Sequence, residues 1–200
     1  MKIMAASDMH GDKELIKRLA KKAEKADIIV LCGDLTYAES SLEGIIGPFK
    51  KAKKPILVVP GNHESMASID FLVSTYSPEV YNIHGTGMVF ENVGFFGCGF
   101  SDIGFFSMTE EDIEKTLMNA YEFVKKADKK IMVTHTPPYD TNLDELGWTK
   151  AGSIGVRKVI EKIKPDFCLC GHIHETFGFE DKIGKTRVIN VGREGMIIEV

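Results

Sequence analysis

The chain has 200 residues, with 25 Lys and Arg against 29 Asp and Glu, and a formal net charge of −4 at pH 7. This balance gives the surface no overall field that would attract nucleic acid or an anionic membrane. The apolar runs are only about as long as a strand, so no segment is predicted to cross a bilayer. We expect one domain spanning residues 1–200, in the cytoplasm, because the apolar N-terminal run is too short for a signal peptide. The cysteines lie in apolar runs and are expected to be buried, reduced thiols: Cys32, Cys98, Cys168 and Cys170.

In the first half of the chain, buried strands alternate with helices. Continuous apolar runs are typical of strands covered on both faces, and apolar residues three or four positions apart are typical of helices. The expected strands are Lys2–Ala6, Asp27–Cys32 and Pro55–Val59. The expected helices are Asp12–Lys25, Glu39–Lys51 up to its Gly47-Pro48 interruption, and a third capped by Ser65 that runs to about Tyr76.

The second half adds hairpins. Glu91-Asn92 is predicted to be a tight hairpin turn, and Thr109 with Asp112 resembles a capping box at a helix start. The expected strands are Gly85–Phe90, Val93–Gly97, Lys130–Thr134 and Asp166–Cys170, with Glu175–Glu180, Arg187–Val191 and Met196–Val200 closing the chain as antiparallel strands. The expected helices are Glu110–Lys126 and Ser153–Ile163, with a long irregular loop at Pro137–Lys150. This order predicts an α/β fold of four layers, a sandwich in which two mixed β-sheets pack face to face with helices outside.

Polar residues that can bind metals stand where the predicted strands end. The phrases are Ser7-Asp8-Met9-His10-Gly11, Gly33-Asp34, Gly61-Asn62-His63-Glu64, Thr134-His135-Thr136 and Gly171-His172-Ile173-His174. In open α/β sheets, ligands bind outside the carboxyl ends of the strands, so these side chains are expected to meet. A single His beside Gly is more often a capping or core residue, but five such phrases at successive strand ends favour a shared site. His84 lies outside this pattern and is interpreted as a surface or packing histidine.

The residue types indicate a centre with two metal ions. Carboxylate, amide and imidazole groups together suit a borderline divalent ion such as Mn²⁺, Fe²⁺ or Zn²⁺ better than Ca²⁺. The candidates are too many for one ion that must keep a position open, and they suit two ions bridged by a carboxylate and a hydroxide. They are Asp8, His10, Asp34, Asn62, His135, His172 and His174.

In order, spacing and strand context, these motifs resemble those of the calcineurin-like metallophosphoesterases, and of a small uncapped branch in particular. The resemblance implies one metal held by Asp8, His10, Asp34 and His174, and a second held by Asp34, Asn62, His135 and His172. It also implies that His63 stands over the site as a catalytic residue and not as a ligand. Many phosphatases of this family orient that His with an Asp three residues after the bridging one, where this chain has Tyr37. Glu39 or another loop would then have to supply the carboxylate.

We therefore expect a hydrolase of phosphodiesters, with cyclic nucleotides among the candidate substrates, that works by attack of a metal-bridging hydroxide. Mn²⁺ is the expected metal, with Fe, Zn or Ni as alternatives. The alternative functions are a phosphomonoesterase, a nuclease on the same site, and a catalytically silent scaffold that binds proteins. A nuclease would need a basic groove, for which this acidic chain has no added domain. The expected partner is a small phosphoester, and a homodimer is left open.

Aromatic residues in two long loops are candidates for substrate selection. They are Phe105 and Phe106 in Ser101–Met108, and Tyr139 and Trp148 in Pro137–Lys150. Exposed aromatic rings beside a phosphate site can stack on a base. The same rings could equally hold the loops in place by local packing. Arg193 is a candidate phosphate contact, with an ordinary surface role as the alternative.

Overall fold

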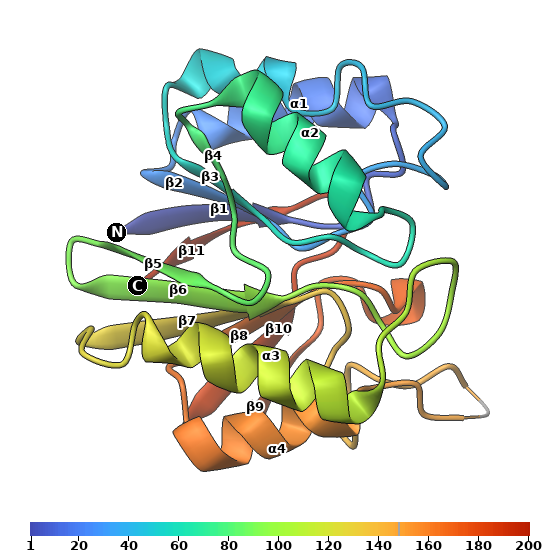
Figure 1. The fold of residues 1–200 in the computed structure, drawn as a ribbon, viewed down its shortest axis with the longest axis vertical. Helices are drawn as coiled ribbons and strands as arrows, with labels where there is room; N and C mark the ends of the chain where they lie inside the picture. The colour runs from blue at the N-terminus through green and yellow to red at the C-terminus, as the bar shows by residue number, and fades with distance from the viewer. Residues whose placement is uncertain (148) are drawn as a thin grey trace.

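The computed structural model describes residues 1–147 and 149–200. Two β-sheets stack face to face, and helices cover the outer side of each sheet (Figure 1). Both sheets mix parallel and antiparallel pairs. The predicted α/β architecture of four layers is therefore confirmed.

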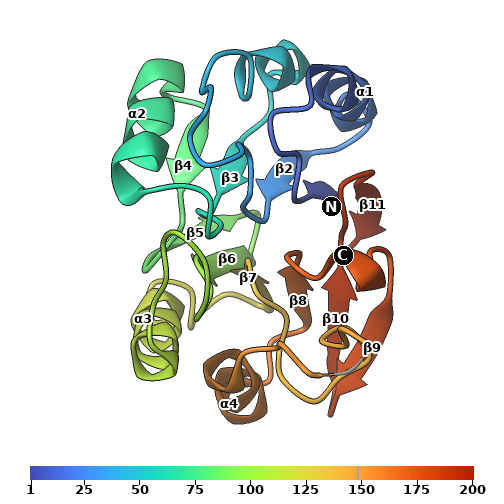
Figure 2. The same cartoon turned by 90° about the vertical axis from the view of Figure 1, so that its right-hand side faces the viewer.

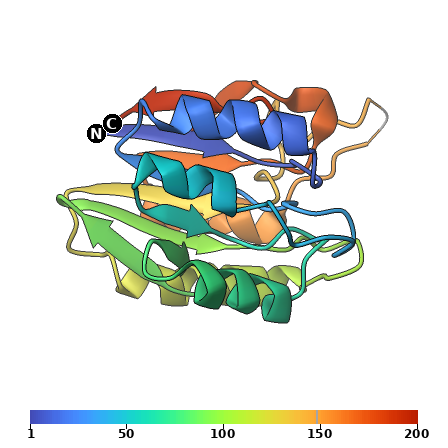
Figure 3. The same ribbon diagram turned by 90° about the horizontal axis from the view of Figure 1, so that it is seen from above.

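The first sheet has five strands, and the four of them that come from the N-terminal half of the chain run parallel to one another. In spatial order they are β11 (Met196–Glu199), β1 (Lys2–Ala6), β2 (Ile28–Leu31), β3 (Ile56–Val58) and β4 (Val80–Asn82). Strand β11 pairs antiparallel with β1 at one edge. The outer face is covered by α1 (Lys13–Ala23), α2 (Met66–Tyr76) and the 3₁₀ helix η1 (Gly47–Ala52), which lie nearest the viewer in Figure 3.

The second sheet has six strands. In spatial order they are β5 (Gly87–Phe90), β6 (Val93–Cys98), β7 (Lys129–Thr134), β8 (Phe167–Cys170), β10 (Thr186–Asn190) and β9 (Glu180–Ile183). The four central strands are parallel, and the two edge strands are antiparallel to their neighbours. Helices α3 (Glu110–Glu122) and α4 (Ile154–Ile163) cover the outer face, and the 3₁₀ helix η2 (His174–Thr176) follows β8.

Apolar side chains fill the spaces between all four layers. Along β1, Ile3 and Ala5 face the other sheet, whereas Met4 and Ala6 face the helices. All four are fully buried, because successive side chains of a strand point to opposite faces and both faces are covered here. This explains why the strands read as continuous apolar runs. The cysteines at positions 32, 98, 168 and 170 are buried free thiols within these layers, as expected.

Side-chain caps determine where the helices begin. Asp12, Ser65, Thr109 and Ser153 each accept a hydrogen bond from the backbone N–H three residues further on, at 3.0 to 3.2 Å. The predicted starts at Ser65 and Thr109 are therefore confirmed. The Asp112 carboxylate accepts the Thr109 hydroxyl at 2.8 Å. A cap of this kind typically stabilises a helix by about 1 kcal/mol.

The predicted helix at Glu39–Lys51 is wrong up to Gly47. Residues 39–46 form turns, and only η1 is helical. Ala38, Glu39 and Gly44 have φ values of 46°, 58° and 78°, in the left-handed region that a right-handed helix excludes. The apolar residues of this stretch pack against the first sheet from a winding loop instead.

The predicted strand at Glu175–Glu180 is also wrong, because the chain turns into η2 after β8. The buried amide of Asn190 causes this turn, since its Nδ2 donates to the carbonyl of Ile173 and to the hydroxyl of Thr176, both at 2.9 Å. Strand β9, which begins where the predicted strand ends, pairs antiparallel with β10, whereas β11 joins the other sheet. Strand β4 has only three residues and was not predicted.

The parallel strands of both sheets end at the same side of the molecule, which faces the viewer in Figure 2. The loops that carry the predicted metal ligands leave the strands there. In the described part of the chain, the helices fall short of the length and apolar character that crossing a membrane requires.

Candidate metal centre

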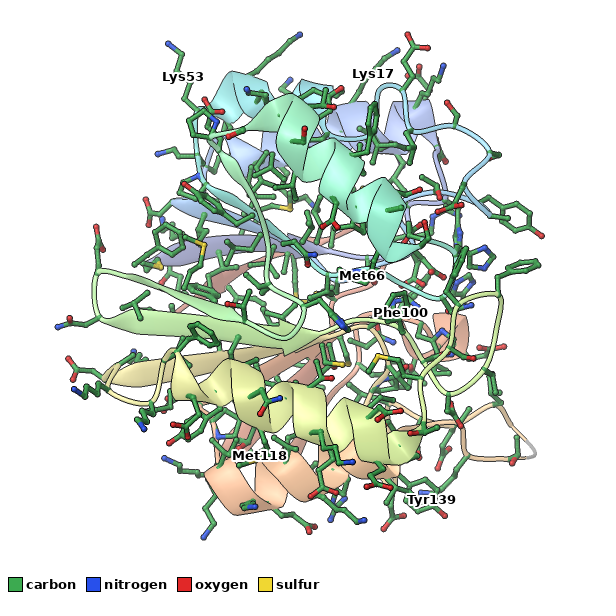
Figure 4. All side chains as sticks on the ribbon, in the orientation of Figure 1. Lys17, Lys53, Met66, Phe100, Met118 and Tyr139 are labelled. Carbon is green, nitrogen blue, oxygen red and sulfur yellow. The ribbon has the colours of Figure 1, made fainter. Side chains whose placement is uncertain are left out.

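The loops after five strands, three from the first sheet and two from the second, bring the predicted site residues together. Asp8 and His10 follow β1, Asp34 follows β2, Asn62 and His63 follow β3, His135 follows β7, and His172 and His174 follow β8. The structure groups them as Asp8 with His10 and His174, as Asp34 with His135 and His172, and as His10 with Asp34 and His63. Figure 4 labels Met66, the first residue of α2, and Phe100, which follows β6, toward this end of the sheets. Every predicted metal ligand therefore lies in one cluster at the junction of the two sheets.

The backbone is left-handed at four of the predicted ligands. The φ values are 55° at Asp8, 45° at His10, 49° at Asp34 and 71° at His172. Residues other than Gly adopt this conformation at an energetic cost, and such positions concentrate at functional sites. Hydrogen bonds between the first two loops hold it, because the N–H groups of Asp8 and His10 donate to the carbonyls of Gly33 and Asp34, both at 3.0 Å.

In the first group, hydrogen bonds orient Asp8 and His10 through one polar atom each and leave the other polar atom of each side chain available to a metal. Asp8 is fully buried, and its Oδ2 accepts the backbone N–H of His172 at 3.0 Å. Its Oδ1 has no hydrogen-bond partner among the described residues and faces Nε2 of His174 at 3.5 Å. Nδ1 of His10 lies 3.2 Å from the carbonyl of Thr36, so this nitrogen carries the proton and Nε2 is free to bind a metal. A buried carboxylate oxygen without a partner beside two free imidazole nitrogens fits a divalent cation.

The second group brings lone pairs face to face. Nε2 of His135 lies 3.4 Å from Oδ1 of Asp34, 3.0 Å from Oδ1 of Asn62 and 3.2 Å from Nδ1 of His172. Nδ1 of His135 donates to the carbonyl of Cys32 at 2.8 Å, which leaves the Nε2 lone pair pointing at these acceptors. Acceptors that converge in this way repel one another unless a proton or a cation lies between them. The donor set therefore fits a second metal ion, with Asp34 reaching both groups.

The electrostatics of the cluster favour binding of a cation. Burial alone would raise the pKa of Asp34, but the nearby imidazoles, His135 foremost, hold that pKa well below its ordinary value. Burial alone would lower the pKa of His135, but the charge of Asp34 outweighs it and raises that pKa to about 9. Burial and the neighbouring His135 lower the pKa of His172 to about 4. Without a metal, the site thus holds a proton on His135 that an incoming ion must replace.

His63 lies beside the carboxylate of Asp34, with Nε2 3.8 Å from Oδ2. The backbone N–H of Ala38 donates to its Nδ1 at 3.1 Å, so the ring proton must be on Nε2, the atom that faces the site. Glu39, which we considered as the orienting carboxylate, is engaged elsewhere: its Oε1 accepts the N–H and the hydroxyl of Ser65 at 2.8 and 2.6 Å. A backbone amide from the loop that carries Tyr37 therefore orients His63.

Glu64 supports the cluster by binding the backbone of two of its loops, a role that sequence reasoning missed. It is fully buried and accepts the N–H and the hydroxyl of Thr36 at 2.8 and 2.9 Å, and the N–H of Gly61 at 2.9 Å. Burial, with the charge of Asp34, raises the pKa of Glu64 to about 7. This carboxyl group ties the loop after β2 to the loop after β3. The signal available in the sequence was an acid directly after Asn62-His63.

Two glycines allow the loops to approach closely. A β-carbon on Gly61 would overlap the Oδ1 and backbone nitrogen of Asp34, and one on Gly171 would overlap Ser7 and Asp8. Only a residue without Cβ fits at these positions.

Aromatic rings border the site. Tyr37 and Phe105 are 60% and 68% exposed, and their ring centroids lie 5.0 and 5.5 Å from that of His63. Tyr139 is exposed on the neighbouring long loop at the lower right of Figure 4, and Trp148 lies outside the described residues. Phe106 is only partly exposed.

The remaining sequence candidates have ordinary contacts. The guanidinium of Arg193 donates to the carboxylate of Asp12 at 2.9 Å, and both side chains are exposed. His84 accepts the backbone N–H of Gly99 at 3.0 Å and packs against Phe100. This agrees with the interpretation of His84 as a packing residue.

Comparison with known proteins places the chain in a family. A model of the calcineurin-like phosphoesterases matches residues 1–176. The uncharacterized protein MJ1162 of Methanocaldococcus jannaschii is 35% identical over 201 residues, which cover 95% of this chain and 87% of that protein. A UPF0046 protein of Caenorhabditis elegans is 26% identical over 213 residues, which cover 96% of this chain and 70% of that protein.

Solved structures share the fold. The protein TT1561 of Thermus thermophilus superposes with a TM-score of 0.76 at 22% identity, over 96% of this chain and 88% of that one. A dimetal phosphatase from Danio rerio superposes with a TM-score of 0.64 at 12% identity, over 96% and 87% of the two chains. Since the family model covers most of the chain, this protein belongs to the calcineurin-like phosphoesterases, a family of hydrolases that generally depend on two metal ions.

Proposed function

We propose that the protein is a phosphodiesterase that depends on two divalent metal ions and acts on small phosphodiesters. The observation that carries the proposal is the pair of adjacent ligand groups, because the carboxylate of Asp34 lies 3.4 Å from Nε2 of His135 in one group and 3.8 Å from Nε2 of His10 in the other, and the buried Oδ1 of Asp8 has no hydrogen-bond partner among the described residues. Membership of a phosphoesterase family supplies the reaction class. The choice of diesters over monoesters rests on the aromatic border of the site, and the choice of Mn²⁺ rests on its oxygen and nitrogen donors.

The proposed ligands are those that the family resemblance implies, and the grouping of their side chains supports them. One ion would be held by Asp8, His10, Asp34 and His174, and the other by Asp34, Asn62, His135 and His172. When bound, such ions supply Lewis acidity, which lowers the pKa of water and neutralises charge on a phosphoryl group. Oxygen and nitrogen donors without a thiolate suit Mn²⁺, with Fe, Zn or Ni as alternatives.

We assign His63 as the catalytic residue that stabilises charge on the phosphoryl group. Since Ala38 donates to Nδ1, the ring is held as the tautomer with the proton on Nε2, facing the site. A neutral imidazole donates a hydrogen bond to an oxygen anion readily, whereas giving the proton away would leave an imidazolate. The geometry therefore favours transition-state stabilisation by His63 over protonation of the leaving oxygen.

The border of the site favours diesters. A monoester carries up to two negative charges and one organic group, and a diester carries one charge and two organic groups. The border presents exposed rings at Tyr37 and Phe105, while the nearby cation Arg193 is paired with Asp12. Two exposed aromatic rings and a cation already paired with a carboxylate match the less charged and more apolar ester. Cyclic nucleotides are one class of such small diesters.

The test uses metal-stripped protein reconstituted with Mn²⁺ and assayed with bis(4-nitrophenyl) phosphate and with 4-nitrophenyl phosphate. We expect faster hydrolysis of the diester. Asp34→Asn should abolish hydrolysis and lower the bound metal measured by mass spectrometry, because it removes the shared ligand. Asp70→Asn, a substitution of an exposed carboxylate on α2, is the matched control. Faster hydrolysis of the monoester would favour a phosphomonoesterase. Inactivity on both esters with every divalent metal tried would refute an esterase and favour the scaffold.

A further inference from the structure

Two exposed aromatic side chains flank the imidazole of His63. The ring of Tyr37 is tilted by 34° to that of His63, and the ring of Phe105 meets it edge-on at 68°. Single exposed apolar residues are common on protein surfaces and need no explanation. Here two of the most exposed rings of the described residues, which come from different sheets' loops, converge on one site residue. This convergence points to a ligand.

The backbone on the Tyr37 side is rigidly held. The preceding residue, Thr36, is bound through its N–H and hydroxyl to the buried carboxyl of Glu64. The following residue, Ala38, is left-handed and donates to His63. The carbonyl of Tyr37 itself accepts the N–H of Ser40 at 3.0 Å. The backbone that carries the ring is thus fixed, and the exposure of Tyr37 does not result from a loose loop.

The Phe105 side is held by contacts with Asn62. The N–H of Phe106 donates to the carbonyl of Asn62 at 3.2 Å, and Gly104 packs so tightly that a β-carbon there would lie 2.5 Å from Nδ2 of Asn62. At the base of this loop, the N–H of Met108 donates to the carbonyl of Ser101 at 2.8 Å. Local packing therefore holds the loop through its backbone and leaves the ring of Phe105 facing outward.

We propose that Tyr37 and Phe105 form an aromatic clamp that binds a planar aromatic group of the substrate next to His63. The inference rests on the proposed function and names its substrate class: phosphodiesters in which one organic group carries an aryl ring or a nucleobase. Aromatic rings of protein and ligand stack without needing a particular pattern of hydrogen bonds. Tyr37 stands where many phosphatases of the family have an Asp that orients the catalytic His. Here the side chain of Tyr37 would bind substrate, and the backbone N–H of the next residue, Ala38, orients His63.

The test compares two ligands that differ only in whether one six-membered ring is aromatic and planar or saturated and puckered. Benzyl(methyl)phosphinate and (cyclohexylmethyl)(methyl)phosphinate each carry one negative charge and cannot be hydrolysed, and they imitate a diester. Their Kd values are measured by isothermal titration calorimetry on the Mn²⁺-loaded protein. We expect the wild type to bind the benzyl ligand about tenfold more tightly, a difference of about 1.4 kcal/mol. The ratio of the two Kd values should approach one in Tyr37→Ala and in Phe105→Ala.

Two further variants separate clamp binding from general effects. Tyr37→Phe keeps the ring and should keep the preference. Phe123→Ala removes an equally exposed ring, 62% exposed at the end of α3 that leads into the start of β7, opposite the site, and should leave the ratio unchanged. An adenine-bearing methylphosphinate identifies the source of the ring: tighter binding than the benzyl ligand indicates a nucleobase, and weaker binding indicates a simple aryl group.

The outcomes distinguish the two proposals. Equal Kd values for the planar and saturated ligands in the wild type, with hydrolysis of bis(4-nitrophenyl) phosphate intact, would overturn the clamp alone. A wild-type preference that persists in both Ala variants would also overturn it. Absence of binding by either ligand, together with absence of hydrolysis, would overturn the proposed function as well. Circular dichroism of each variant should match that of the wild type, because the substituted positions are exposed.

Discussion

Replacement of Gly61 by Ala should disable the proposed centre by steric overlap. A β-carbon at this position would overlap the Oδ1 and nitrogen of Asp34 and would lie 2.8 Å from its Cγ. Contacts between carbon atoms are optimal at about 3.5–4.0 Å, so Asp34 would have to move by about 1 Å. Gly61 is anchored by its hydrogen bond to Glu64 at 2.9 Å and is not free to yield. Its φ lies outside the left-handed region, so the clash is the direct cause of the predicted effect.

Overpacking of this kind typically costs about 1–3 kcal/mol, and for a chain of this size each kcal/mol lowers Tm by about 2–4 °C. We therefore expect Tm of the metal-stripped Gly61→Ala protein to fall by about 2–12 °C, measured by circular dichroism. A displacement of about 1 Å at a catalytic group can lower activity by about 10²-fold, and we expect a loss of kcat/KM of this order with bis(4-nitrophenyl) phosphate. Bound Mn²⁺ should fall in parallel.

Gly47→Ala provides the matched control, because the nearest atoms to a β-carbon there all belong to Tyr76, at ordinary distances of 3.5 to 3.9 Å. It should retain the Tm and the metal content of the wild type. If Gly61→Ala melted at the wild-type temperature and bound the wild-type amount of Mn²⁺, the close approach of these two loops would not matter for the centre and the reasoning would be refuted.

Three further outcomes are expected. The metal-stripped protein should become less stable as pH rises from about 6.5 to 9. Burial opposes protonation of His135, but the charge of Asp34 outweighs burial and raises the folded-state pKa of His135 to about 9, above the ordinary 6.5. The stabilisation that protonated His135 gives below pH 6.5 is therefore lost as pH rises through this range. Urea unfolding at pH 6 and pH 9 measures this, and equal or greater stability at pH 9 would contradict it. Glu64→Gln should lower the free energy of unfolding by about 1.5–3 kcal/mol, because an amide cannot accept at both ends as the buried carboxyl does; an unchanged urea midpoint would argue against that role. Arg193→Ala should cost less than about 1 kcal/mol and leave bound Mn²⁺ unchanged, because its pair with Asp12 is exposed, and a loss of metal would instead assign Arg193 to the site.

The sequence predicted the strands and helices best where local signals agreed. The apolar run before Asp34 and the cap at Ser65 each determine local structure through neighbouring residues, and both predictions hold. The prediction of a helix from Glu39 was wrong because the apolar residues are spaced as in a helix, whereas the backbone turns through left-handed residues. Residues Glu175–Glu180 failed because Asn190, distant in sequence, bends the chain there.

The gathering of the ligands could be predicted because parallel strands deliver their ends to one edge. Which atoms meet could not be predicted, because this depends on backbone geometry at residues such as His172. The support of His63 by the N–H of Ala38 was also beyond sequence reasoning, since every residue except proline carries that donor. The placement of Tyr37 and Phe105 on either side of His63 was likewise beyond sequence reasoning, because it depends on how loops from two different sheets fold over the site.

The first and last residues lie side by side at the end of the sheets opposite the proposed centre, as Figure 1 shows. The amino group of Met1 donates to the carbonyl of Val200 at 3.0 Å, and β1 pairs with β11 from there. A short linker from Val200 to Met1 would therefore close the backbone into a ring, which could be reopened at the Glu91-Asn92 turn, also remote from the ligands. Strands β1 and β11 are the pair most distant in sequence in the present chain. In such a circular permutant the linker would join them directly, and their pairing would become a local hairpin. Because chains rich in local contacts fold faster, the rearranged protein should assemble its first sheet sooner than the natural order of strands allows.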